Sequence, residues 1–113
     1  MTIISSTRAD VPVIIIDRGR LADDRALQEL YEEIVAEVEH RQKRHVVLDF
    51  ELVETVTSPG LSMLIRAKHK LDESGAKLHL CGFGANVAEV IQATKLHRLF
   101  PVHENRLAAL KTI

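Results

Sequence analysis

Residues 57–60, Thr-Ser-Pro-Gly, place two hydroxyl side chains between a strand-like run and a helix-like run. Serine is among the side chains preferred at a helix N-cap, and proline is favoured at the first helical position because its missing N–H would be unpaired there. Proline also restricts the preceding residue to the extended region that an N-cap requires. These rules predict Ser58 as the N-cap of a helix that begins at Pro59.

The same position is suited to phosphorylation. A phosphoryl group at a helix start adds about −1.5 to −2 charge opposite the positive end of the helix dipole. We expect the backbone amides of Gly60 and Leu61 to bind such a group, whereas Pro59 offers no donor. The residues alone leave two interpretations of Ser58 open, a structural cap and a phosphorylation site.

The other reactive residue types give little indication of chemistry. Asp49 follows a strand, where α/β proteins often place functional groups, but a lone carboxylate is more typical of a turn hydrogen bond. Cys81 lies in an apolar strand and is expected to be a small core residue. Residues 81–85, Cys-Gly-Phe-Gly-Ala, lack the third glycine of the dinucleotide fingerprint and the Walker lysine, so they predict a tight turn. The histidines show no spacing typical of a metal site: His40, His45, His69, His79, His97 and His103. We therefore expect no catalytic residue, no cofactor and no metal ion.

Composition narrows the class of protein further. The chain has 113 residues, 46% of them hydrophobic, which suits one domain with a moderate core. Its net charge of −1 disfavours binding to nucleic acid. A single cysteine excludes an internal disulfide, the start of the chain shows no secretion signal, and the longest apolar run is too short for a membrane span. We expect a cytoplasmic protein that does not insert into a membrane.

Hydrophobic periodicity predicts alternating strands and helices. The expected strands are 13–16, 45–50, 77–81 and a short one around Val102, with residues 2–8 as a candidate edge strand within a first ten residues that could otherwise form a frayed arm. The expected helices are 24–40, 59 to about 74, one capped by Asn86 with Glu89 three residues later, and a last one carrying Leu107 and Leu110. This order predicts an α/β fold over residues 1–113, a single domain whose largely parallel, mixed sheet of four to five strands is flanked by about four helices.

Several segments of the chain together resemble one family. Gly-Arg-Leu at 19–21 after a strand and before a helix, VVLDFELVETVTSPGLSMLI at 46–65, and KLHLCGFGANVAEVIQATKLHRLFPV at 77–102 look like a STAS domain of the anti-sigma factor antagonist type. The resemblance extends from about Pro12 to Leu110. Its most specific part is the strand, aspartate, loop, Ser-x-Gly-Leu and helix around Ser58.

The resemblance implies a non-catalytic, protein-binding regulator. Its expected partner is an anti-sigma factor that is also a serine kinase and phosphorylates Ser58, with a phosphatase to reset the switch. Thr57 and Ser62 are weaker candidates for the phosphate. The family's common loop is Asp-Ser-Ser-Gly or Ser-Ser-Ala-Gly, so Thr57 replaces the acidic residue and Pro59 replaces the later hydroxyl. The expected partner-binding residues are Thr55, Val56, Thr57, Ser58, Pro59, Gly60, Ser62 and Met63.

Three alternatives stay open at this point. The altered loop also fits a constitutive STAS scaffold or a transport-associated subunit, such as a partner of a lipid-transport ATPase, that is never phosphorylated. Met63 lies off the main apolar stripe of its predicted helix and could instead fill an irregular gap in the core. The sequence does not distinguish a monomer from a weak homodimer.

Overall fold

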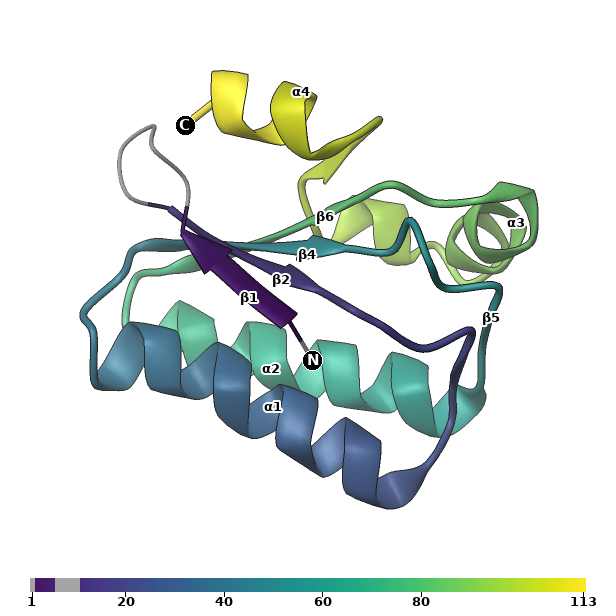
Figure 1. Cartoon of the computed structure of the whole chain (residues 1–113), viewed down its shortest axis with the longest axis horizontal. Helices are drawn as coiled ribbons and strands as arrows, with labels where there is room; N and C mark the ends of the chain where they lie inside the picture. Colours follow the sequence, from purple (N-terminus) through teal and green to yellow (C-terminus); the bar gives the residue numbers. More distant parts are fainter. Residues whose placement is uncertain (1, 6–10) are drawn as a thin grey trace.

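The computed structural model describes residues 2–5 and 11–113, and in them a five-stranded sheet has the order β1-β2-β4-β6-β7 (Figure 1). β1 pairs antiparallel with β2, whereas β2, β4, β6 and β7 are parallel. The strands are β1 Thr2–Ser5, β2 Pro12–Ile15, β4 His45–Asp49, β6 Lys77–Cys81 and β7 Val102–His103. The mixed, largely parallel sheet is therefore confirmed. Of the candidate edge strand, residues 2–5 form β1 and residues 6–8 lie outside the described residues.

Four α-helices of the described chain lie on the two faces and at one end of this sheet. Figure 1 shows α1 and α2 together on one face, α4 on the other, and α3 beyond the end of the sheet. The helices are α1 Asp24–Glu39, α2 Ser58–Glu73, α3 Ala85–Ala93 and α4 Arg106–Lys111, with a short 3-10 helix, η1, at Leu96–Arg98. This is the α/β arrangement of strands and helices that the sequence predicted.

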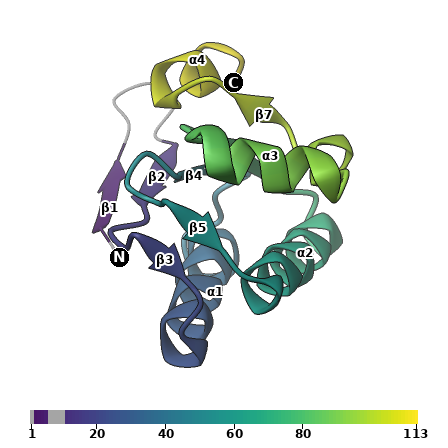
Figure 2. The same ribbon diagram turned by 90° about the vertical axis from the view of Figure 1, so that its right-hand side faces the viewer.

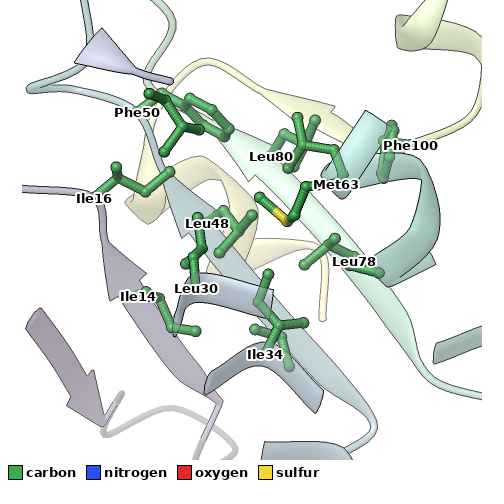
Figure 3. Packing of buried hydrophobic residues seen from close by; sticks show 14 of the residues in the cluster. Ile14, Ile16, Leu30, Ile34, Leu48, Phe50, Met63, Leu78, Leu80 and Phe100 are labelled. Carbon is green, nitrogen blue, oxygen red and sulfur yellow. The ribbon is translucent and has the colours of Figure 1, made fainter. Parts of the chain in front are cut away.

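The main core fills the space between the sheet and the pair α1 and α2 (Figure 3). Alternate residues of the central strands, such as Ile14 on β2, Leu48 on β4 and Leu80 on β6, are fully buried there. A second, smaller cluster lies on the opposite face, where Ala109 of α4 packs with Val11, Val13, Val47 and Cys81. Apolar residues on both faces explain why the sequences of β2 and β4 are continuous apolar runs and do not alternate with polar residues.

The apolar period of residues 59–74 predicts a buried stripe of Leu61, Leu64, Ile65 and Leu71, and the stripe observed on α2 differs from it. Leu64 and Leu71 are buried as expected, but Leu61 and Ile65 are only half-buried. The stripe also includes Gly60, Met63 and Ala67. Steps of four, three and four residues join Gly60, Leu64, Ala67 and Leu71, so small side chains complete a regular helical face that bulky residues alone do not reveal.

The start of α3 was predicted two residues too late. Its N-cap is Gly84, with φ −74° and ψ 174°, and Asn86 is the second helical residue. Gly82 turns the chain directly after β6 with φ 76°, a conformation that favours glycine. The predicted tight turn at 81–85 is thus confirmed, but it is short enough for the helix to begin before Asn86 can cap it.

Candidate partner-binding site

A small two-stranded ribbon positions the loop that contains Ser58. β3, Arg20–Leu21, pairs in parallel with β5, Thr55–Val56, at the end of the molecule where α2 begins (Figure 2). The carbonyl oxygen of Gly19 accepts hydrogen bonds from the amides of Glu54 and Thr55 at 2.7 and 3.0 Å. The loop is therefore fixed to the segment before α1 and presented at the surface.

The N-cap of α2 is Thr57, one residue before the predicted Ser58. Thr57 is extended, with φ −90° and ψ 170°, and its carbonyl oxygen accepts the first helical bond from the Leu61 amide at 3.0 Å. Its hydroxyl does not cap the helix but donates to the carbonyl oxygen of Leu21 at 3.2 Å, which also accepts the Thr57 amide at 3.3 Å. The cap moves upstream because both polar groups of Thr57 are held by β3, which fixes that residue in the extended region.

Gly60 permits the close contact between α2 and the ribbon. A Cβ atom at this position would lie 2.9 Å from the Leu21 carbonyl oxygen and 2.9 Å from Cγ1 of Val56. Real Cβ atoms do not approach a backbone oxygen so closely. Only glycine fits here, and it allows the start of α2, with Ser58, to lie close against β3 and β5.

Ser58 is exposed and is the first residue of α2. Its amide and that of Gly60 donate no hydrogen bond within the described chain, as expected for the first turn of a helix. The Leu61 amide, which was expected to be free for a phosphate, is instead used in the first helical bond. Pro59, the second helical residue, has no N–H, so Ser58 and Gly60 hold the unpaired amides nearest the hydroxyl.

The model of the STAS domain family matches residues 22–109, a span that includes α1, β5, the loop, α2, α3 and the first part of α4. The chain belongs to the STAS domain family. Within it, the relatives are anti-sigma factor antagonists. BtrV of Bordetella bronchiseptica, provisionally named as one, is 30% identical over 82 residues, which are 73% of this chain and 70% of that protein. The anti-sigma F factor antagonist of Paenibacillus polymyxa is 22% identical over 73 residues, which are 65% of this chain and 62% of that protein.

Solved structures of this type have the same fold. An anti-sigma factor antagonist from Mycobacterium paratuberculosis has a TM-score of 0.80 at 24% identity, with 99% of this STAS domain and 92% of that chain covered. The antagonist SpoIIAA in its unphosphorylated form gives 0.78 at 18% identity, covering 98% and 94%. The phosphorylated Bacillus SpoIIAA gives 0.71 at 17% identity, covering 99% and 98%. Anti-sigma factor antagonists of this fold are non-catalytic, and their partner is an anti-sigma factor.

The predicted partner-binding residues of this STAS domain divide into two groups. Thr55, Ser58, Pro59 and Ser62 are exposed, and Thr57 is half-buried. Val56, Gly60 and Met63 are buried, so their prediction as surface residues was wrong. These three residues pack beneath the loop. Met63 is fully buried in the main core, as its alternative interpretation as a gap-filling residue requires.

The remaining reactive residues have structural surroundings. Asp49 accepts a hydrogen bond from the Glu51 amide at 2.9 Å, as predicted for a turn, and its other oxygen pairs with Nε of Arg106 at 2.9 Å. Cys81 is buried, and burial, followed by the charge of Asp49, raises the pKa of its thiol to about 12. Sequence reasoning missed the role of Arg106, because nothing local indicates that α4 returns to the end of β4.

The described residues hold neither a cluster of metal-ligating side chains nor a helix that could span a membrane. No group of three or more histidine, cysteine, aspartate or glutamate side chains surrounds a point where a metal ion could be held. No helix there combines the length and the apolar character needed to cross a bilayer.

Proposed function

We propose that this STAS domain is an anti-sigma factor antagonist that binds a serine-kinase anti-sigma factor through the exposed residues of the loop 55–62, and that phosphorylation of Ser58 weakens this binding. The observation that carries the proposal is the exposure of Ser58 at the first residue of α2 in a chain of this family. A phosphatase would reverse the modification.

The surroundings favour Ser58 over the neighbouring hydroxyls as the phosphate acceptor. Thr57 is half-buried and its hydroxyl is engaged with the Leu21 carbonyl oxygen, so phosphorylation there would break a contact that holds the loop. Ser62 is exposed but lies a full turn inside α2, where its backbone is helical. Ser58 alone combines exposure, no side-chain partner among the described residues and a position at the very start of the helix.

Phosphorylation at Ser58 would change the binding surface more than the fold. The exposed residues Thr55, Pro59 and Ser62 around it are uncharged. A phosphate would add about −1.5 to −2 charge to this neutral surface, while the positive end of the α2 dipole and the unpaired amides would tolerate it. A partner that binds the neutral form would then have to remove water from this charge at the interface.

Incubation with the cognate kinase and ATP, followed by intact-mass measurement, tests the acceptor. Wild type should gain the mass of one phosphoryl group, Ser58→Ala should gain none, and the matched control Ser62→Ala should behave as wild type. A phosphate that persists in Ser58→Ala would refute Ser58 as the acceptor.

Binding measurements with the same partner test the switch itself. Ser58→Asp should bind at least about tenfold more weakly than wild type, a loss of about 1.4 kcal/mol, and Ser62→Asp should lose less. The constitutive-scaffold alternative predicts equal binding by wild type and Ser58→Asp and no mass gain with ATP. A kinase gene beside this gene would support the switch, whereas a transporter operon would support the alternative.

A further inference from the structure

Three histidines from three neighbouring strands form a continuous hydrogen-bonded row. Nδ1 of His45 on β4 lies 3.0 Å from Nε2 of His79 on β6, and Nδ1 of His79 lies 3.1 Å from Nε2 of His103 on β7. His79 is 4% exposed, whereas the two outer rings are half-buried. The His79 and His103 rings stack with their centroids 5.3 Å apart. We call these three side chains the histidine row.

Proton counting limits what the histidine row can hold. A neutral imidazole has one N–H and one bare nitrogen, and each contact between two rings needs one proton. In the neutral row the direction of the first hydrogen bond fixes the second. The three rings must therefore share one tautomer, all Nδ1–H or all Nε2–H.

One extra proton can be accommodated by this row, but a second cannot. Two contacts hold one proton each, and the two outward nitrogens, Nε2 of His45 and Nδ1 of His103, hold at most one each. The row therefore has places for four protons. Three neutral rings carry three protons and each positive charge adds one, so a row with two positive charges carries five. The fifth proton places two N–H groups against each other and breaks one of the contacts.

The charges around the histidine row oppose even the first proton. Burial is the largest effect on each ring and lowers the pKa of all three, that of His79 to about 4. The positive charge of Lys77 on β6 further lowers the pKa of His45 and His79. Arg44, before β4, also lowers the pKa of His45. The charged residues of α4, which packs on this face, are the cations Arg106 and Lys111. Arg106 is paired with Asp49 and Glu51, and Glu104, beside His103, is exposed.

The segment at the His103 end has few other attachments to the sheet. β7 is an edge strand with two residue pairs to β6, Leu80 with Val102 and Cys81 with His103. α4 is six residues long and contributes one fully buried side chain, Ala109. Figure 2 shows β7 and α4 on the other side of α3 from β3, β5 and the start of α2. Ser58 is the first residue of α2. A broken contact in the histidine row should therefore loosen this segment first.

We propose that the histidine row is a proton-sensitive latch, which holds β7 and α4 on the sheet while it is neutral and releases them in mildly acidic solution. This conformational device is independent of the Ser58 switch and of the partner. The part that it releases is the C-terminal segment 102–113, and it needs no ligand.

Nitrogen-15 NMR of the histidine side chains in the wild-type protein tests the latch directly. At pH 7.5, His45, His79 and His103 should show the shifts of a single shared tautomer, whereas His97 on η1, which is exposed, should show the usual mixture. On acidification, His79 should remain neutral well below the ordinary histidine pKa of 6.5. Different tautomers within the histidine row would overturn the proposal, and this result does not depend on any variant folding.

Hydrogen exchange tests the release of the C-terminal segment. If the open segment lets His79 titrate near 6.5 instead of about 4, protection of the amides of 102–113 should fall about tenfold or more between pH 7.5 and 5.0, after correction for the intrinsic chemistry. His79→Gln should lose most of this pH dependence, and His97→Gln should keep it. An unchanged protection in wild type, or an equal fall in wild type and a folded His79→Gln, would refute the latch.

Discussion

At the scale of single residues, Gly60 makes the sharpest stability prediction. Gly60→Ala places a methyl group 2.9 Å from the Leu21 carbonyl oxygen, and backbone must move to relieve the contact. We expect a loss of about 1–3 kcal/mol in the free energy of unfolding, larger than the gain of up to about 1 kcal/mol from the better helix propensity of alanine. Urea unfolding measures it.

The matched control is Gly84→Ala, where a Cβ would meet no atom within 4 Å. It should cost less than about 1 kcal/mol, through the N-cap preference alone. Equal effects of the two substitutions would contradict the steric role of Gly60.

Cys81 provides a second prediction about a single side chain. Burial raises the pKa of its thiol to about 12, so thiolate is scarce at pH 8 and solvent does not reach it. We expect a disulfide reagent to react with the native protein at least about a hundredfold more slowly than with the urea-unfolded chain. Rapid reaction in native buffer would show that β6 and the cluster beneath α4 open readily.

The sequence predicts that a helix begins in this loop, but not which residue is its N-cap. The rules for Ser and Pro place a cap within one residue of the truth, since Thr57, Ser58 and Pro59 all allow a helix start. A long-range contact decides among them, because the Leu21 carbonyl oxygen holds both polar groups of Thr57. Nothing within 57–60 indicates that partner, which lies 36 residues earlier in the chain.

At the scale of elements, the first residue of α4, Arg106, attaches this helix to the end of β4 through its ion pair with buried Asp49. Asp49 is 2% exposed at its side chain and Arg106 35%, so Arg106→Met leaves a buried carboxylate without its cation. A fully buried pair costs about 3–5 kcal/mol when one partner is removed, and we expect about 2 kcal/mol because Arg106 is partly solvated. Urea unfolding gives the loss of stability, and limited proteolysis within 104–113 should become faster.

Arg98→Met in η1 is the control for this ion pair, because Arg98 is exposed and should change stability little. Asp49→Asn added to Arg106→Met should recover part of the loss by removing the unpaired charge. If the two side chains do not interact, the losses of stability of Arg106→Met and Asp49→Asn should simply add in the double variant. Such additivity would contradict the ion pair.

The long elements were the predictable ones. Runs such as His45 to Phe50 and the repeats of α1 carry their period within one segment, so strand and helix follow from local sequence. The buried face of α2 was predicted only in part, at Leu64 and Leu71, because Gly60 and Ala67 are too small to be recognised as apolar anchors. β3 and β5, two residues each, were not predicted, because their pairing is created by the approach of 19–21 to 54–57 and not by either sequence alone.

At the scale of the whole molecule, strand register brings together side chains that sequence spacing separates. His45, His79 and His103 were dismissed as a group because no short spacing joins them. Each was nevertheless placed in or beside a predicted strand. What the sequence lacks is the register between strands, in which Val47 pairs with His79 and Cys81 with His103, so that the three rings step diagonally across one face.

This arrangement also sets how global stability depends on pH. The folded protein lowers the pKa of His79 from 6.5 to about 4, so the unfolded chain binds the proton more tightly. Its contribution to stability is complete above about pH 6.5 and is lost as the pH falls toward 4. Lowered pKa values at His45 and His103 act in the same direction. Glu33, whose pKa is raised chiefly by burial, has the opposite sign, because its protonation below about pH 4.5 favours the folded state.

From these shifts we expect the free energy of unfolding to fall by about 2 kcal/mol between pH 7.5 and 5.0 from His79 alone, at 1.36 kcal/mol per pKa unit. Urea titrations at the two pH values measure the difference. His79→Gln should flatten it, whereas His97→Gln should not, since His97 is exposed in the folded protein. Stability that is constant or higher at pH 5.0 in wild type would mean that the histidine row gains protons on folding, contrary to its burial beside Lys77.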